Sequence, residues 1–292
     1  MTSTHIVIVN YNSGDWLERS VRSALEFSDG RVSVVDNLST DNSVTDCKAA
    51  ISDKRVEWHL NDQNVGFAAA NNQVLKNIDS EFAILMNPDC QLNEDSLFRI
   101  LEAMQKDVSI GLASCQILNE DGSLQATCRR RFPTPWSAFV RIFALDRLFP
   151  DNPRFENFDY GDQVDDSVSV EYVEAISGAF MVARMPFVNE VGLLDEDYFM
   201  HCEDLDWCKR AHLNGWQVAF IPSARVVHAK GVGSKSRPIA VLYTLHTGMS
   251  RFFDKFYVND YGLPLRLTVK AGIATSFIVR ALVSVFSGVL GR

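Results

Sequence analysis

The first half of the sequence alternates short apolar runs with segments of helical spacing, and this alternation restricts the chain to few architectures. Runs rich in apolar and β-branched residues predict strands at 5–11, 31–37, 56–60 and 82–86. The stretches between them, beginning with 16–25, carry apolar residues at helical intervals and predict helices. Strands and helices in this order build a mostly parallel sheet covered on both faces. We therefore expect an α/β fold.

Polar residues follow three of these strands at the point where each strand ends. They are Asn10-Tyr11-Asn12, Asp36-Asn37 and Asn87-Pro88-Asp89. A single Asp or Asn in such a place often forms a turn or caps a helix. Ligands of open parallel sheets bind beyond the carboxyl ends of the strands, so three polar ends at one edge favour a binding site.

Two common nucleotide-binding motifs are missing from the sequence. The first strand is followed by "NYNSGDW", whose single glycine cannot form the GxGxxG fingerprint of dinucleotide-binding folds. The GxxxxGK[ST] pattern of P-loops does not occur either. A nucleotide diphosphate can instead be neutralised by a divalent cation that one or two carboxylates hold. Asp89 is placed for that role.

Composition and charge limit the class of protein. With 292 residues, 47% of them hydrophobic and 22% charged, the chain can bury one large core with an appendage. The net charge is −9, yet residues 229–292 carry nine Lys or Arg and only two acids. The acidic body argues against a nucleic-acid partner. The six cysteines form no CxxC pair and no signal peptide is visible, so we expect reduced thiols in a cytoplasmic protein.

An ordered set of motifs resembles the family 2 glycosyltransferases, and most closely the rhamnosyltransferase-type members of bacterial cell-surface polysaccharide and O-antigen synthesis. The motifs are "VIVNYNSGDWLERSVRSAL", "VVDNLSTDNS", "NVGFAAANN", "ILMNPD", "SGAFMVAR" and "DEDYFMHCEDLDWCKRAHLNGWQVAFIPSARVVH". The resemblance implies a GT-A domain over residues 1–235, with a nucleotide-binding half at about 1–115 and an acceptor half at about 116–235. A C-terminal amphipathic helical extension would follow at 236–292. It also implies inverting transfer from a nucleotide sugar, with dTDP-rhamnose as the expected donor.

The resemblance also implies roles for individual residues at the sheet edge. The nucleotide-binding residues would be Tyr11, Asn12, Asp36, Gly66, Asn71 and Asn87. Asn87 stands where the family pattern has the first acid of a DxD motif, and so it brings no charge. A divalent cation, Mg²⁺ or Mn²⁺, would then rest on Asp89, with His228 in the place of a second ligand. A lone histidine at a strand end is otherwise usually structural.

The segment 201–215 contains three acids within four residues. Acids at the start of a helix are commonly a solvated cap that interacts with the helix dipole. The alternative is catalysis, because an acceptor hydroxyl becomes a good nucleophile only when a positioned base removes its proton. By resemblance to the family's ED motif, Asp204 would be that base. Glu203 would orient it or bind the acceptor, and Asp206 is the reserve candidate.

The C-terminal part is apolar and basic. Its longest uncharged run, 281–291, is shorter than the ~20 residues that span a bilayer, so we expect a helix lying in the membrane interface. Packing of this helix on the body or on another subunit is the alternative. A saccharide or polyprenyl-linked acceptor would place the enzyme on the cytosolic face of the inner membrane, attached peripherally. The mixed basic and aromatic stretch 128–150 faces membrane or acceptor, or is an amphipathic helix on the core.

Two other functions remain open from the sequence alone. One is a catalytically silent nucleotide-sugar-binding protein of the same fold, which Asn87 makes conceivable. The acids at 203–206 argue against it. The other is a nucleotidyltransferase, which would need a glycine-rich basic loop after the first strand to hold a triphosphate. The segment "NYNSGDW" has no such loop.

Overall fold

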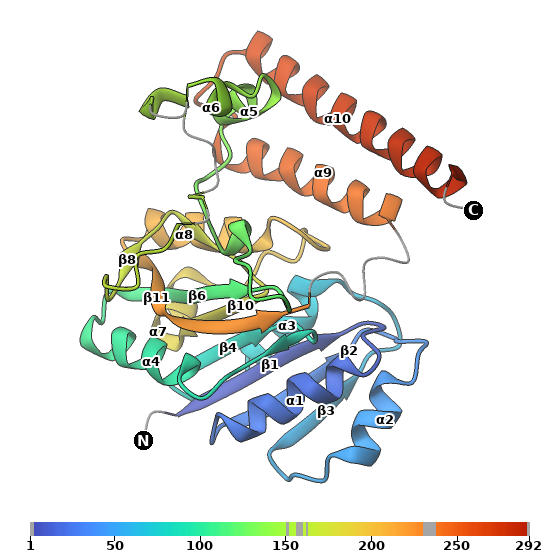
Figure 1. Cartoon of the computed structure of the whole chain (residues 1–292), viewed down its shortest axis with the longest axis vertical. Coiled ribbons are helices and arrows are strands. Elements are labelled where there is room, and N and C mark those ends of the chain that lie inside the picture. Colours follow the sequence, from blue (N-terminus) through green and yellow to red (C-terminus); the bar gives the residue numbers. More distant parts are fainter. Residues whose placement is uncertain (1–2, 150–151, 156–159, 162, 230–237, 291–292) are drawn as a thin grey trace.

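A computed structural model describes residues 3–149, 152–155, 160–161, 163–229 and 238–290 (Figure 1). Its centre is a nine-stranded sheet in the order β3-β2-β1-β4-β10-β6-β11-β5, with β8 also paired to β11. The strands of this sheet are β1 (Thr4–Asn10), β2 (Arg31–Asp36), β3 (Val56–Leu60), β4 (Phe82–Met86), β5 (Cys90–Gln91), β6 (Ile110–Leu118), β8 (Glu171–Tyr172), β10 (Phe180–Arg184) and β11 (Gln217–His228). A separate pair joins β7 (Arg129–Arg130) to β9 (Ala175–Ile176).

Helices cover this sheet and extend beyond it. Around the sheet lie α1 (Trp16–Glu26), α2 (Ser43–Ala50), α3 (Phe67–Leu75), α4 (Ser96–Lys106), α7 (Met185–Val191) and α8 (Glu203–Leu213). At one end of the molecule, away from the sheet, are α5 (Pro135–Ile142), α6 (Leu145–Leu148), α9 (Pro238–Phe256) and α10 (Leu263–Leu290) (Figure 1). Short 3₁₀ turns occur at Ala126–Cys128 and Pro153–Phe155.

The four N-terminal strands form the predicted parallel sheet. β1 pairs in parallel with both β2 and β4, and β2 pairs in parallel with β3. All five residues of β4 are buried, as its uninterrupted apolar run requires when both faces are covered. The register places Asn10 opposite Asp36, and Met86 ends next to them on the other side of β1. The three polar strand ends therefore share one edge.

The second half of the sheet is mixed, which the sequence did not indicate. β10 runs antiparallel between β4 and β6, while β11 is parallel to β6. β5 then pairs antiparallel with the end of β11. Because β10 is shared between β4 and β6, one continuous sheet joins the two halves that the motifs distinguish. The boundaries of those halves, and of the extension from residue 236, stay a prediction; residues 230–237 and 291–292 lie outside the described part.

Candidate active site

The corner between β1 and β2 holds Asp36 in a fixed orientation. Its Oδ1 accepts hydrogen bonds from Asn10 Nδ2 at 2.7 Å and from Ser39 Oγ at 2.6 Å. Its Oδ2 accepts one from the backbone N–H of Ser39 at 3.0 Å. Asn10 Nδ2 also reaches Ser39 Oγ and Ser43 Oγ, both at 3.0 Å. The hydrogen bonds from Asn10 and Ser39 thus orient the Asp36 carboxylate before a ligand binds. This pre-organisation lowers the free-energy cost of binding a ligand.

Left-handed backbone conformations mark the same corner. Asn12 has φ 53° and Leu38 has φ 63°, although neither is glycine. The side chain of Asn12 stabilises its turn, because its Oδ1 accepts the backbone N–H of Thr40 at 2.7 Å. Leu38 remains exposed, and Tyr11 is half-buried beside Asn12. Non-glycine residues in this region cost of order 1–3 kcal/mol each and gather at ligand sites.

Gly66 permits a close approach that a larger residue would block. It has φ 88°, and a Cβ placed on it would lie 2.4 Å from the backbone oxygen of Phe199. The adjacent N–H of Phe67 donates to that same oxygen at 2.8 Å. Asn37 Nδ2 donates to Gly66 O at 3.1 Å, so the start of α3 is tied to the end of β2. The glycine therefore joins the predicted nucleotide corner to the segment that precedes the acidic helix.

Two neighbouring asparagines on α3 have different surroundings. Asn71 is buried, and its Nδ2 donates to Phe67 O at 2.9 Å, while its Oδ1 has no hydrogen-bond partner. Asn72 binds the backbone of Leu194 twice, through Nδ2 to the oxygen at 2.8 Å and through Oδ1 to the N–H at 3.2 Å. Asn72 is a structural link across the two halves, and Asn71 keeps an oxygen that a ligand can use.

The pairing of β5 with β11 brings Asp89 and His228 together. His228 is opposite Cys90 in this register, and the N–H of Ala229 donates to Asp89 O at 3.0 Å. His228 Nε2 consequently lies 3.1 Å from Asp89 Oδ1 and 3.3 Å from Asn87 Nδ2. The three residues predicted from the "NPD" motif and the strand end thus form one cluster, although 139 positions separate Asp89 from His228.

Gln125 contacts both the imidazole ring and the backbone of His228. Its Oε1 lies 3.1 Å from His228 Nδ1, and its Nε2 donates to the backbone oxygen of His228 at 2.8 Å. With its proton on Nδ1 the ring would donate to Gln125 Oε1, which would leave Nε2 free to bind a cation that Asp89 also holds. Such a hydrogen bond to the far nitrogen is the usual support of a metal-binding histidine.

The pair Asp89 and His228 fits a divalent cation only with outside ligands. Among the residues that the structure describes, no group of three or more His, Cys, Asp or Glu side chains is arranged to hold a metal. Mg²⁺ and similar ions at nucleotide sites take one or two carboxylates and complete their shell with phosphates and waters. The donor set therefore suits a cation that enters with a nucleotide diphosphate.

The acidic helix α8 begins after two strained residues, His201 and Cys202, with φ 74° and 70°. Asp204 is buried at its start, where Oδ2 lies 2.5 Å from Arg130 Nη2 and accepts the N–H of Gly178 at 2.9 Å. Its Oδ1 accepts the N–H of Leu205 at 2.7 Å. A Cβ on Gly178 would lie 3.3 Å from the Asp204 side chain, so the glycine allows this close contact.

The two carboxyls at the start of α8 are electrostatically unlike. Burial and the adjacent charge of Asp204 raise the pKa of Glu203 to about 8, and Glu203 Oε2 has no hydrogen-bond partner. Burial also acts to raise the pKa of Asp204, but the charge of Arg130 and the N–H of Gly178 outweigh it and hold that pKa below its usual value. Near pH 7 Asp204 is ionised and can accept a proton, whereas Glu203 is protonated.

Asp206 has a different role in the structure. Its Oδ1 lies 2.6 Å from Arg210 Nε, and its Oδ2 lies 2.6 Å from Lys255 Nζ on α9, an ion pair without hydrogen-bond alignment. The side chain is fully buried between these two cations. This arrangement attaches α9 to α8 and engages both carboxylate oxygens of Asp206 with cations.

Two backbone contacts connect the Asp89 cluster to Asp204. The N–H of Asn87 donates to Ala179 O at 2.9 Å, and the N–H of the preceding Gly178 donates to Asp204 Oδ2. Residues 178 and 179, which lead into β10, therefore touch both groups. The backbone of these two residues therefore ties the end of β4 to the start of α8.

Three residues of the site were not singled out from the sequence: Asn72, Gln125 and Arg130. Arg130 pairs with a residue 74 positions away, and Gln125 contacts one 103 positions away. The triplet Arg129-Arg130-Arg131 beside aromatic residues was the only signal, and it was equally compatible with a surface-seeking segment.

Comparisons with known proteins identify the family of the chain. Residues 5–159 match the family described as "Glycosyl transferase family 2". The chain is 27% identical over 288 residues to the N-acetylglucosaminyl-diphospho-decaprenol L-rhamnosyltransferase of Mycobacterium tuberculosis, covering 92% of this chain and 90% of that protein. It is 24% identical to the rhamnosyltransferase WbbL of Escherichia coli K12, covering 77% of this chain and 82% of WbbL.

Solved structures share the fold. The mannosyltransferase PcManGT from Pyrobaculum calidifontis, in complex with GDP-Man and Mn²⁺, superposes with a TM-score of 0.58 at 16% identity, covering 94% of this chain and 69% of its own. GalNAc-T7 with UDP, GalNAc and Mn²⁺ also gives 0.58, at 17% identity, over 78% of this chain and 44% of that one. The expected GT-A fold is thus confirmed. The chain belongs to glycosyl transferase family 2, and it is a glycosyltransferase of the rhamnosyltransferase type.

Proposed function

We propose that this enzyme transfers L-rhamnose from dTDP-rhamnose to a hydroxyl of a lipid-linked saccharide, with inversion at the anomeric carbon. The observation that carries the proposal is the bridge of residues 178 and 179 between the Asp89–His228 pair and Asp204. The proposal is that the cluster at Asp89 binds the diphosphate and that the ionised Asp204 acts as the base on the same sugar. The names of the two rhamnosyltransferase relatives support rhamnose as the sugar and, for the mycobacterial one, a lipid-linked acceptor. Surface polysaccharide synthesis is the setting that we propose.

The nucleotide would lie along the polar strand ends. Asp36 is oriented to accept hydrogen bonds from the base, with Tyr11 and Asn12 beside it, and Asn71 offers a free amide oxygen. Gly66 keeps the start of α3 close to this corner, and Asn87 is placed to bind a ribose or sugar hydroxyl. Asp89 and His228 Nε2 would hold the divalent cation, which acts as a Lewis acid on the departing diphosphate.

The protein's own residues then account for the acceptor side. Asp204 takes the proton of the attacking hydroxyl, because Arg130 keeps its carboxylate ionised and Gly178 keeps it oriented. Protonated Glu203 can donate a hydrogen bond that orients the acceptor. Attack from the face opposite the leaving diphosphate inverts the anomeric configuration, which NMR of the product linkage would show.

We also propose that the enzyme works peripherally on the cytosolic face of the inner membrane. The name of the mycobacterial relative describes an acceptor attached to decaprenol, which resides in a bilayer. In the described part of this chain, one helix, α10, contains a 24-residue span long and apolar enough to cross a membrane, with none of it buried, although the uncharged run 281–291 suggests a shorter apolar segment. Because Arg266, Lys270 and Arg280 lie within this span, we propose that it lies in the membrane interface and does not cross the bilayer.

A thermal-shift screen tests the choice of donor. A ligand present at a hundred times its dissociation constant stabilises the folded state by about 2.7 kcal/mol. We expect dTDP-rhamnose with Mg²⁺ or Mn²⁺ to raise the melting temperature clearly, and dTDP-rhamnose with EDTA to raise it much less. UDP- and GDP-linked sugars under the same conditions are the controls. An equal shift with a UDP- or GDP-linked sugar would contradict the assigned donor.

The raised pKa of Glu203 gives a prediction on pH dependence. Its protonated form is present below about pH 8 and is lost as the pH rises through that value, which places a second negative charge beside Asp204. Turnover of the wild type should therefore fall on the alkaline side. Glu203→Gln keeps a neutral hydrogen-bond donor, so it should retain most activity at pH 7 and lose the alkaline decline. A pH profile of kcat for both proteins checks this, and an unchanged decline in the variant would rule Glu203 out as its cause.

A further inference from the structure

The exposed hydrophobic side chains gather at one end of the molecule. Of the 25 large hydrophobic residues that are exposed in the described chain, six lie in 136–149 and eleven lie on α9 and α10. Figure 1 shows α5, α6, α9 and α10 together at this end, away from the sheet that carries the active site. Exposed apolar area of this extent marks an interaction surface.

The outer side of α5 is apolar along one stripe. Trp136, Phe139 and Phe143 follow one another at helical intervals of three and four, and all are exposed, while Val140 is fully buried on the other side. Their rings contact in sequence, with centroids 5.5 Å apart for Trp136 and Phe139 and 4.6 Å apart for Phe139 and Phe143. The residues of this stripe take no part in the packing of helices on the sheet or in the candidate active site.

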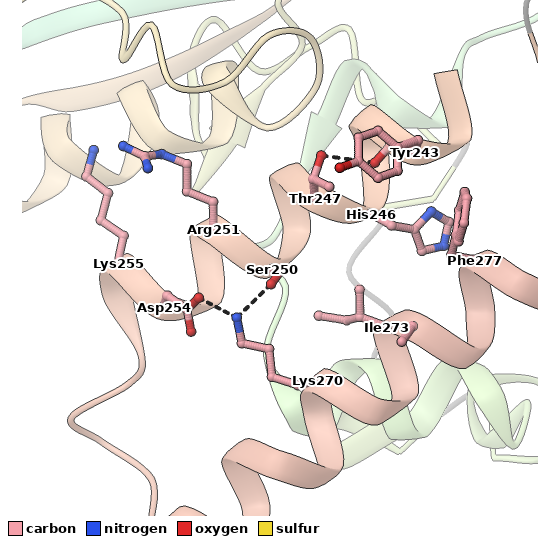
Figure 2. Close-up of a pocket in the computed structure, with 11 residues that line it drawn as sticks. Tyr243, His246, Thr247, Ser250, Arg251, Asp254, Lys255, Lys270, Ile273 and Phe277 are labelled. Atoms are coloured by element: carbon pink, nitrogen blue, oxygen red, sulfur yellow. Dashed lines mark hydrogen bonds and ion pairs between the residues drawn. The ribbon is translucent and has the colours of Figure 1, made fainter. Parts of the chain in front are cut away.

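The long helix α10 attaches to α9 through its polar side. Figure 2 shows Lys270 of α10 reaching Asp254 and Ser250 of α9, with the Ser250 Oγ 2.6 Å from Lys270 Nζ. Phe277 packs edge-on against His246, with ring centroids 5.6 Å apart. An open groove of about 740 Å³ lies along this contact. The opposite face of α10 is exposed, and its large side chains are Leu267, Ile278, Val279, Leu282, Val285 and Phe286.

Basic residues accompany both apolar faces. α5 and α6 carry two arginines and one acid, and the described residues 238–290 carry five Lys or Arg and two acids. Arg147 and Arg280 are both exposed. Arg251, Lys255 and Lys270 pair with Asp195, Asp206 and Asp254, so the positive charge at this end rests on other basic residues, Arg147, Arg266 and Arg280 among them. Aromatic and aliphatic side chains flanked by Lys and Arg are typical of segments that lie in the interface of an anionic membrane.

We propose that α5 and α6 form a second membrane-binding element, which docks together with the outer face of α10 on a bilayer that contains anionic lipids. This inference deepens the proposed function, since a lipid-linked acceptor is presented at such a surface. A single helix leaves a protein free to rotate on the membrane. Contact at both α5–α6 and α10 fixes the orientation of the protein on the bilayer. The strand β7, which contains Arg130, leads into α5, so this contact also sets the position of the Arg130–Asp204 region relative to the membrane.

Vesicle binding of the full chain tests the proposal without either substrate. Ile142→Ser/Phe143→Ser removes two side chains that are 73% and 57% exposed, and Phe98→Ser/Val108→Ser is the matched control, with 66% and 71% exposure elsewhere. We expect the first variant to partition at least tenfold more weakly than wild type onto phosphatidylglycerol vesicles. The control should stay within twofold. Ile278→Ser/Leu282→Ser on α10 should weaken binding as well.

Two further readouts keep the outcome clear if a variant is unstable. Tryptophan fluorescence of the unmodified protein should be quenched by bromine-labelled phosphatidylglycerol, and Trp136→Phe should remove much of that quenching. Unchanged vesicle binding of Ile142→Ser/Phe143→Ser would overturn the proposal. So would a loss of self-association in that variant without a loss of vesicle binding, because a second copy would then cover the face. Undiminished transfer to a water-soluble acceptor would show that the proposed function survives whichever result is found.

Discussion

Replacing Asp204 with Asn is expected to lower the rate of sugar transfer by a factor of about 10²–10⁴. The amide keeps the shape of the side chain and can still accept the N–H of Gly178, but it cannot take a proton from the acceptor. Binding of the nucleotide donor should be spared, because Asp204 lies on the acceptor side of the bridge at residues 178 and 179. Single-turnover transfer and calorimetric titration with the donor nucleotide measure the two effects separately.

Asp206→Asn is the matched control for this variant. It removes the same charge two residues further along α8, from a side chain that sits between Arg210 and Lys255. Breaking a buried ion pair destabilises a protein by about 3–5 kcal/mol, so this variant should melt earlier. Its folded fraction should nevertheless transfer sugar. If Asp204→Asn kept wild-type turnover, the base assignment would be wrong; if both variants bound nucleotide and only Asp206→Asn lost turnover, the reserve candidate would replace it.

Asp89→Asn is expected to have the second large effect. It removes the carboxylate charge that lies 3.1 Å from His228 Nε2 while preserving the size of the side chain. A Lewis-acid cation contributes several kcal/mol to the transition state, and 1.36 kcal/mol corresponds to a factor of ten in rate. We therefore expect kcat/KM to fall by about 10²-fold or more, with a higher divalent-ion concentration needed for half-maximal activity. Titration of activity with Mn²⁺ measures both.

Glu94→Gln serves as the control for loss of one negative charge in the same segment. Glu94 is exposed and lies five positions beyond Asp89. Its substitution should leave the Mn²⁺ dependence unchanged, because a solvated surface charge is screened within about a Debye length. An Asp89→Asn variant with the Mn²⁺ dependence of wild type would place the cation elsewhere.

The first half of the fold could be predicted from sequence because its strands are short runs rich in apolar and β-branched residues that alternate with helical patterns. The strand predicted at 56–60 has the bounds of β3, and the runs at 5–11 and 31–37 differ from β1 and β2 by one residue. The second half could not be predicted in the same way. β10 lies antiparallel between β4 and β6, and such pairing depends on contacts between segments about 70 to 100 residues apart.

The residues of the candidate site were likewise predicted from the sequence only in part. Motif resemblance located Asp89, His228 and Asp204 in the chain, and the fold then explained why the first two meet, through the short pairing of β5 with β11. The resemblance gave no basis for Arg130, whose charge decides that Asp204 rather than Glu203 is ionised. The local sequence around Arg130 does not indicate that it forms an ion pair with Asp204, 74 residues away. The pKa difference between the two acids therefore emerges only from packing.

The central claim is that one sugar spans the cation held by Asp89 and the base at Asp204. A crystal structure with Mn²⁺ and a non-transferable analogue of dTDP-rhamnose tests it directly, because the anomalous signal of manganese locates the cation. We predict a peak bound to Asp89 and His228 Nε2, with the Asp204 carboxylate on the opposite side of the sugar ring from the diphosphate. Manganese bound away from Asp89, or a ring whose free face points away from Asp204, would contradict the account.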